Sequence, residues 1–298
     1  MKKLGVILIG LVMSAGVTYG QERVDSTTST TTTTATETTT TTAGATNGDT
    51  GYNPLSVRPI HVSDIMWKKT ILRAIDLREK QNKPLFARNK EITRLLMDAV
   101  HKGDLTPFAN DSLERKITID EFDEAMLIPV EGGTLTAEEK EIALANGDSS
   151  VLQSGGPAYY FPTDIYQLTL KEDMIFDKQR SRLYYDIIAV TMLVPADLPS
   201  NVKGIEQVIA SFSYKELVEK VFKDNPKAIW FNVQNDQQHK NLADAFDLRL
   251  FSSYITKVSN PNDAYLVDIY GGDQQKGIMA SQWAAMELLE FEHNLWEF

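Results

Sequence analysis

Residues 63–85 constrain the fold most strongly, because they combine a wide apolar face with signals for the start and end of a helix. Ser63 is a favourable N-cap residue, and Pro84 is a stop signal. At 100° per residue, apolar side chains cover nearly half of the circumference, at Ile65, Trp67, Ile71, Leu72, Ala74 and Ile75. Lys69, Arg73 and Asp76 share the opposite side. The pattern predicts an amphipathic helix over residues 63–80 that is buried on more than one side.

The segments that follow also have helical periodicity. Residues 89–103 place apolar side chains at the i, i+3, i+4, i+7 and i+8 positions, and Gly103 is a good residue to end a helix. Thr118 and Glu121 form a capping-box pattern before a short helix. A weaker helix is predicted from Thr136. Residues 128–162 are rich in glycine, proline and acids, which is typical of a surface insertion.

The second half of the chain changes to strand-like composition. Residues 165–170 and 183–194 are rich in β-branched and aromatic side chains, and residues 177–181 between them are typical of a hairpin turn. Residues 208–212 and 228–233 are further predicted strands. Helices are predicted at 217–222, opened by a capping box at Ser213, and at 242–254 and 282–296. Helices followed by mixed strands and helices indicate an α+β fold with a long C-terminal helix.

The N-terminus has the pattern of an export signal followed by a tether. Residues 1–20 combine two lysines, a short apolar run and small residues, which is typical of a cleaved signal peptide; an uncleaved anchor is the alternative. Residues 21–55 are rich in threonine and have almost no apolar side chains, which predicts a disordered tether. Residues 56–298 are then one globular α+β domain, divided into a helical part (56–127), the insertion (128–162) and the α+β part (163–298).

Composition excludes several classes of protein. The chain has no cysteine, which excludes disulfides, thiol catalysis and a lipid anchor at a cleaved signal peptide. The formal net charge is −11, and removal of Lys2 and Lys3 with the signal would make it −13. Such a charge disfavours nucleic acids and anionic lipid surfaces as partners, although simple solubility explains it equally well.

The common catalytic templates fail on inspection. No G-x-S-x-G motif is present. Gly272 and Gly277 have the spacing of a phosphate-binding loop, but Ile278 and Met279 stand where a lysine and a Ser/Thr are required. The sequence therefore predicts no catalytic residue, no cofactor and no nucleotide site.

The sequence gives only weak signals for a metal site or for an acid–base site. The four histidines have no ligand spacing, and Glu290 with His293 is only half of a di-iron motif. Asp244 and Asp247 place two carboxylates one helical turn apart, so a hydrolase that uses this pair remains an alternative. The chain also ends with the large apolar side chains of Leu295, Trp296 and Phe298, which must pack on its own fold or on a partner.

Several motifs occur in the order found in one protein family. They are Asp64 to Lys69, Ile75 to Lys80 with Asn82 and Pro84, Gly103 to Pro107, Leu170 to Asp173, Phe176 to Arg180, Arg249 with Phe251 to Ile255, and Phe291 to Phe298. The chain resembles the GldN/PorN proteins of Bacteroidota, from about Ser56 to Phe298. The resemblance is diffuse at 195–233 and differs at Lys257 and Val258.

This resemblance implies a non-enzymatic periplasmic subunit of the type IX secretion and gliding machinery. It implies self-association in a ring under the outer membrane, an outer-membrane lipoprotein partner (GldK/PorK-like) and contact with the periplasmic part of an inner-membrane motor protein (GldM/PorM-like). No nucleic acid and no direct membrane insertion are expected. A cargo-binding module is a further alternative, and Ser112 lies in a tripeptide that resembles a glycosylation motif.

A ring subunit needs interfaces with aromatic and arginine anchors. The candidate interface residues are Trp67, Lys69, Arg73, Arg78, Trp296 and Phe298. On the predicted helix, Trp67, Ile71 and Ile75 would pack in the core, while Lys69, Arg73 and Asp76 would face another chain.

Overall fold

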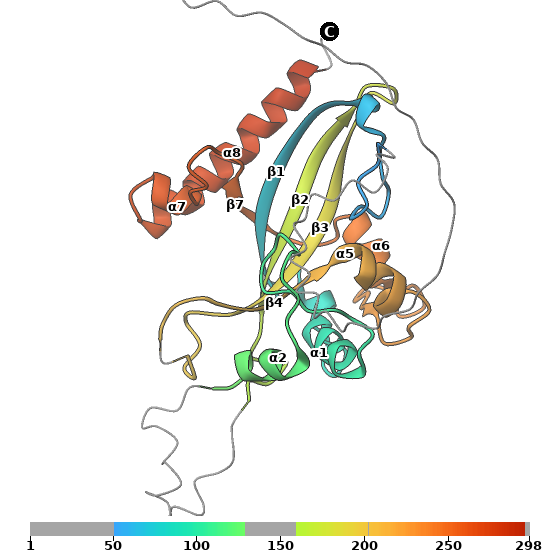
Figure 1. Cartoon of the computed structure of the whole chain (residues 1–298), viewed down its shortest axis with the longest axis vertical. Coiled ribbons are helices and arrows are strands. Elements are labelled where there is room, and N and C mark those ends of the chain that lie inside the picture. The colour runs from blue at the N-terminus through green and yellow to red at the C-terminus, as the bar shows by residue number, and fades with distance from the viewer. Residues whose placement is uncertain (1–50, 129–158, 202, 296–298) are drawn as a thin grey trace, which may run out of the picture. The chain divides into compact units, whose positions relative to one another are not determined.

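A five-stranded antiparallel sheet organises the computed structural model, which describes residues 51–128, 159–201 and 203–295 (Figure 1). The strand order is β4-β3-β2-β1-β7. The strands are β1 (Ile65–Asp76), β2 (Gln167–Asp177), β3 (Arg182–Val194), β4 (Gln207–Ser213) and β7 (Tyr254–Val258). β2, β3 and β4 follow one another as hairpins, whereas β1 and β7 come from segments far apart in the sequence.

Helices and a small second sheet complete the described part. They are η1 (Val62–Asp64), η2 (Lys83–Leu85), α1 (Ile92–Lys102), α2 (Ile119–Ala125), α5 (Tyr214–Glu216), η3 (Leu217–Phe222), α6 (Leu242–Asp247), α7 (Leu266–Ile269) and α8 (Gln274–Leu295), with β5 (Ile229–Trp230) pairing to β6 (Lys240–Asn241). The predicted α+β class with an antiparallel hairpin and a long C-terminal helix is confirmed.

The prediction of a helix over residues 63–80 is wrong, because β1 occupies this position. Trp67, Ile71 and Ile75 are four residues apart, a spacing that places side chains on one face of a helix and also on one face of a strand. Leu72 and Ala74 distinguish the two cases: they lie on the opposite face of the sheet, where they line a groove. Lys69 and Arg73 consequently share a face with Trp67.

Other local predictions divide between confirmed and wrong. The 177–181 hairpin turn, helix α1 with Gly103 at φ 79°, and the capping box at Thr118 are confirmed. Ser213 makes no side-chain cap, and the predicted helix after it is a short α5 that runs into the π-helical turn η3.

The remaining differences are in element lengths. The predicted strand at 228–233 shortens to β5, and the predicted helix at 242–254 ends at Asp247, before β7 starts at Tyr254. The closing helix α8 begins at Gln274 rather than at residue 282. The predicted signal peptide, almost all of the tether (residues 21–50) and the helix at Thr136 lie outside the described residues.

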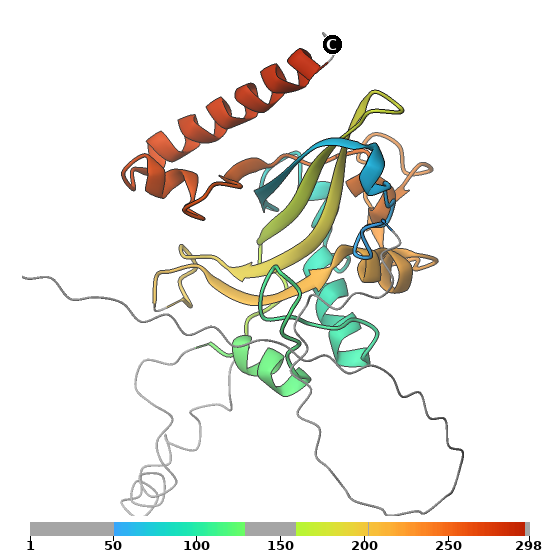
Figure 2. The same cartoon turned by 45° about the horizontal axis from the view of Figure 1, so that its top comes forward.

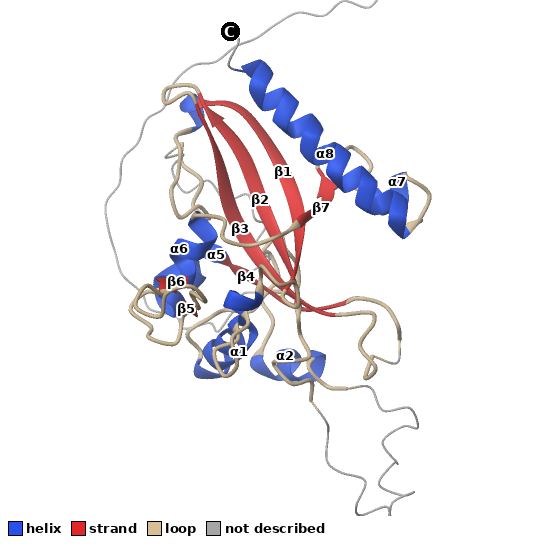
Figure 3. Ribbon diagram, turned by 180° about the vertical axis from the view of Figure 1, so that it is seen from behind, coloured by secondary structure: helices blue, strands red, loops and turns tan. Residues whose placement is uncertain are grey.

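Two apolar clusters cover the same face of the sheet. The larger one joins Ile75, Leu168 and Leu170 to the buried sides of α1 and α6. The smaller one joins Ile71, Met174 and Ile255 to α7 and α8. Figures 2 and 3 show α8 alongside the β1 edge of the sheet, apart from α1, α5 and α6. This separation leaves α8 with a surface that the larger cluster does not cover.

Candidate protein-docking surface

A groove lies between the N-terminal half of β1 and helix α8. Its volume is about 300 Å³. Trp67 of β1 and Phe291 of α8 meet beside it, with ring centroids 4.7 Å apart. Its other lining side chains include Lys69, Val258, Leu266, Tyr270, Trp283, Glu287, Leu288 and Glu290. We call this the β1–α8 groove.

A buried apolar side holds helix α8 close to the sheet. Ala280, Ala284 and Leu288 recur every four residues and are buried in the smaller cluster. The Ser281 hydroxyl accepts a 2.9 Å hydrogen bond from the backbone N–H of Ile255 in β7. Gly277 allows α7 to approach, because a Cβ at this position would lie 2.6 Å from Cγ2 of Val267. These contacts fix the position of the groove wall.

The opposite side of α8 is also apolar, and it faces solvent. Met279, Trp283, Met286 and Leu289 follow helical spacing and are 55%, 58%, 67% and 66% exposed. We call these four residues the outer stripe. A contiguous apolar surface of this kind marks an interaction site in a soluble protein, and methionine adapts well to a partner's shape. The stripe provides the hydrophobic anchor that a protein interface needs.

Acidic residues outnumber basic ones in the segment that carries the outer stripe, and two of them, Glu287 and Glu290, line the β1–α8 groove. Residues 263–295 carry six carboxylates and one lysine, a net charge of −5. The carboxylates belong to Asp263, Asp268, Asp273, Glu287, Glu290 and Glu292. This region therefore favours a partner with basic groups around an apolar centre.

A buried ion cluster lies on the same face of the sheet, between the two apolar clusters. Glu172 is completely buried and accepts hydrogen bonds from Arg73 and from Arg249, the latter at 2.8 Å and 3.3 Å. The Arg249 guanidinium lies 4.4 Å from the ring centroid of Tyr185. Burial raises the pKa of the Tyr185 hydroxyl. The cluster ties β1, β2 and the loop before β7 together.

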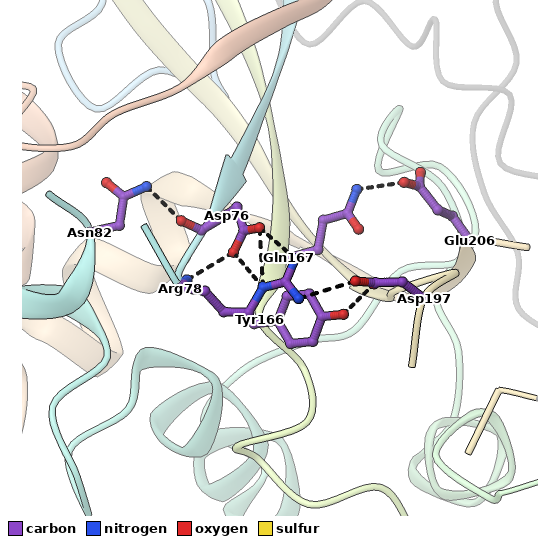
Figure 4. A network of polar contacts seen from close by, with 7 residues as sticks. All are labelled: Asp76, Arg78, Asn82, Tyr166, Gln167, Asp197 and Glu206. Atoms are coloured by element: carbon purple, nitrogen blue, oxygen red, sulfur yellow. Dashed lines mark hydrogen bonds and ion pairs between the residues drawn. The ribbon is translucent and has the colours of Figure 1, made fainter. Parts of the chain in front are cut away.

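A second arginine cluster lies at the C-terminal end of β1 (Figure 4). The Arg78 guanidinium stacks 3.7 Å from the ring centroid of Tyr166 and pairs with Asp76 at 2.8 Å and Asp197 at 3.1 Å. Burial and a hydrogen bond to Asp197 raise the pKa of Tyr166 to about 12, and that same hydrogen bond lowers the pKa of Asp197. Arg78 therefore anchors the turn after β1.

The other face of the sheet carries a larger groove of about 1000 Å³. Its floor includes Leu72, Thr169 and Thr191, and Ser112 lies at its rim. Lys171 of β2 pairs with Asp111 at 3.3 Å and holds the rim loop near the sheet. The groove mixes polar and apolar side chains.

Comparison of the chain with models of known protein families shows which family it belongs to. The family model described as "Gliding motility associated protein GldN" matches residues 60–297. The chain belongs to the GldN family. Members of the GldN family are associated with gliding motility and type IX secretion. No curated protein matches the chain.

The structure brings together only part of the interface set predicted for this GldN-family chain. Trp67 and Lys69 both line the β1–α8 groove. Arg73 lies in the buried ion cluster at Glu172, whereas Arg78 is half exposed and pairs with Asp76 and Asp197 at the end of β1. Trp296 and Phe298 lie outside the described residues. Sequence reasoning missed the outer stripe, although a helical wheel of 274–295, apolar on two sides, would have revealed it.

The positions of Asp244 and Asp247 do not favour the alternative of a hydrolase that uses these two carboxylates. The carboxylate of Asp247 forms a 2.7 Å surface ion pair with Arg58, which lies near the start of the described residues. Asp244 sits in the first turn of α6, where it complements the helix dipole. Among the described residues, no group of three or more His, Asp or Glu side chains could hold a metal ion. No helix in the described ranges has the length and hydropathy needed to span a bilayer.

Proposed function

We propose that this GldN-family chain is a non-enzymatic structural subunit of a periplasmic ring complex of the type IX secretion system. In this proposal it self-associates in the ring and is bound to a GldK/PorK-like outer-membrane lipoprotein, which holds it at the inner face of that membrane. It also meets the periplasmic region of a GldM/PorM-like motor protein. The outer stripe and the β1–α8 groove are its docking surface.

The observation that carries this proposal is the apolar outer side of α8. Helix α8 already buries one side on the sheet, and on its second apolar side Met279, Met286 and Leu289 are more than half exposed, while Trp283 contacts only the edge of Tyr270 among the ring pairs of the described residues. A large exposed Trp–Met surface is costly in a free protein but is suited to a permanent assembly, whose interfaces are rich in aromatic and methionine side chains. Membership of the GldN family supports the gliding and type IX secretion machinery as the setting of that assembly.

A matched pair of substitutions tests the docking surface. Leu289 on the outer stripe and Leu248 beyond α6 are 66% and 57% exposed. Leu289→Glu places a charge in the proposed interface and should weaken assembly by about 2 kcal/mol or more. Leu248→Glu makes the same chemical change outside it and should leave assembly intact.

The assay uses the full chain in a gliding bacterium from which the resident family member has been deleted. Complexes are extracted in detergent, imaged, and probed for the lipoprotein and motor proteins, while secretion and gliding are scored. We expect Leu248→Glu to restore rings and secretion, and Leu289→Glu to yield a folded chain without them. Equal rescue by both variants would exclude the outer stripe, and failure of the unsubstituted chain to join any ring would exclude the proposed function.

A further inference from the structure

Strand β1 has an edge that is only partly paired. β7 pairs with β1 at residues 71–74, and the last contact is a 2.9 Å hydrogen bond from the N–H of Ser259 to the carbonyl of Thr70. Residues 65–69 have β2 on one side. On the other side, the described residues provide no neighbouring strand. Within residues 51–128, 159–201 and 203–295, the strand position beside them, in line with β7, is vacant.

The backbone groups that face this vacancy can be assigned. The carbonyls of Thr70 and Leu72 both point to the β7 side, because they accept hydrogen bonds from Ser259 N–H and from the Thr256 hydroxyl at 3.2 Å. Alternate residues of a strand direct their N–H and C=O to the same edge. The N–H and C=O of Lys68 therefore point away from β2, in the plane of the sheet and toward its open edge. Unpaired backbone groups of this kind can hydrogen-bond to a further strand.

We propose that an extended segment of a partner protein adds to β1 beside residues 65–69 and places its groove-facing side chains in the β1–α8 groove. This inference rests on the proposed function, because it names how the docking surface takes one of its partners. Strand addition supplies affinity through main-chain hydrogen bonds and specificity through pockets for alternate side chains. The groove provides such a pocket on the correct face, since Trp67 and Lys69 line it.

The side chains in the groove define the chemistry of the segment. Trp67, Trp283 and Phe291 offer aromatic surface to an apolar side chain. The charged side chains in the lining are Lys69, Glu287 and Glu290, a net charge of −1, and none of them has an ion-pair partner within the described ranges. The segment that fits carries an apolar residue and a lysine or arginine two positions apart, so that both face the groove.

A second copy of β1 fits the vacancy less well than such a segment. Two β1 edges paired with each other would bring Lys68 and Lys69 of each copy close together, and like charges on paired strands are destabilising. Lysines on an edge strand are a common protection against this kind of self-pairing. Lys68 is held by Asp173 at 2.7 Å, on the face of the sheet opposite to the groove.

Amide hydrogen exchange tests the proposal directly, because strand addition protects specific backbone groups. The full chain is compared in free form and in complexes purified from the complemented gliding bacterium. We expect the amide of Lys68, open in the free chain, to exchange about tenfold more slowly in the complex, while the inward-facing amide of Lys69 changes little. Equal exchange of the Lys68 amide in both states would overturn the proposal.

A matched pair of variants provides an independent test. Lys68→Pro and Lys68→Ala both remove the ion pair with Asp173, but only proline removes the outward N–H. We expect Lys68→Pro to lower the yield of partner proteins at least about fivefold relative to Lys68→Ala, through loss of main-chain bonding. If equal amounts of the partner proteins are purified with both variants, the partner segment does not add to β1 as a strand. If Lys68→Pro unfolds, the exchange measurement alone decides.

The outcomes also separate this proposal from the proposed function. Assembly that depends on Leu289 but shows no protection at Lys68 would leave the structural subunit intact and remove the added strand. A charge test adds detail: Glu290→Lys should reduce partner yield more than Glu290→Gln if the segment is basic. The reverse order would contradict the predicted charge of the segment.

Discussion

Glu172 offers the sharpest test of how the core is held together. It is completely buried, and its two partners Arg73 and Arg249 have side chains that are 14% and 27% exposed. Glu172→Gln keeps the shape of the side chain but leaves two guanidinium groups without a counter-charge. The amide of the new side chain also presents donors where only acceptors fit.

The expected cost follows from this geometry. Removal of one partner from a buried ion pair costs about 3–5 kcal/mol. Both arginines can regain some water through their exposed fractions, so we expect the lower end, about 3 kcal/mol of unfolding free energy. In a domain of this size that corresponds to a fall in Tm of about 6–12 °C.

The assay is urea unfolding of residues 21–298, followed by circular dichroism. Exposed Glu114→Gln is the control and should lie within about 0.5 kcal/mol of the unsubstituted chain. The m value should be unchanged, since the folded and unfolded surfaces are the same. A loss of less than about 1 kcal/mol for Glu172→Gln would refute the reasoning, because the cluster would then be hydrated rather than buried.

Three further predictions concern helix α8, strand β3 and strand β1. Gly277→Ala should destabilise the chain by about 1 kcal/mol despite its better helix propensity, and Val267→Ala in the same chain should reverse the sign, as a double-mutant cycle would measure. Burial, with a smaller contribution from Asp173, raises the pKa of Asp186 to about 6, above its usual value near 4; the folded state therefore loses stability as pH rises through this window. The stability gained by Asp186→Asn should grow between about pH 4 and 6 and stay constant above, which unfolding curves at several pH values would test. Trp67→Ala should raise amide exchange in residues 288–295 about fivefold without global unfolding, through loss of the ring contact with Phe291.

Local signals in the sequence predicted those elements whose side chains distinguish one periodicity from another. Helix α1 was predictable because Leu95, Leu96 and Val100 fit a period of 3.6 and cannot lie on one face of a strand. The β2–β3 hairpin was predictable because Asp177 provides turn chemistry: its carboxylate accepts from the N–H of Gln179 at 2.8 Å and of Arg180 at 3.2 Å.

β1 could not be predicted in the same way, because tertiary pairing overrides a misleading local pattern. Trp67, Ile71 and Ile75 satisfy both periods, and the helix-like caps at Ser63 and Pro84 belong to the flanking elements η1 and η2. Strand pairing with β2 over eleven residues then decides the conformation, and a single sequence does not contain that information.

The same change of period alters which surface is available to a partner. On a helix, Lys69 and Arg73 would have faced away from Trp67, and an interface would have used the charged side alone. On a strand, Trp67 and Lys69 share one face, and α8 stands beside them, so that aromatic and charged groups line a single groove. Arg73 is on that face too, but Glu172 binds it internally. The expected contacts therefore lie at a sheet edge, where the main chain itself can bind, rather than on a charged helix surface.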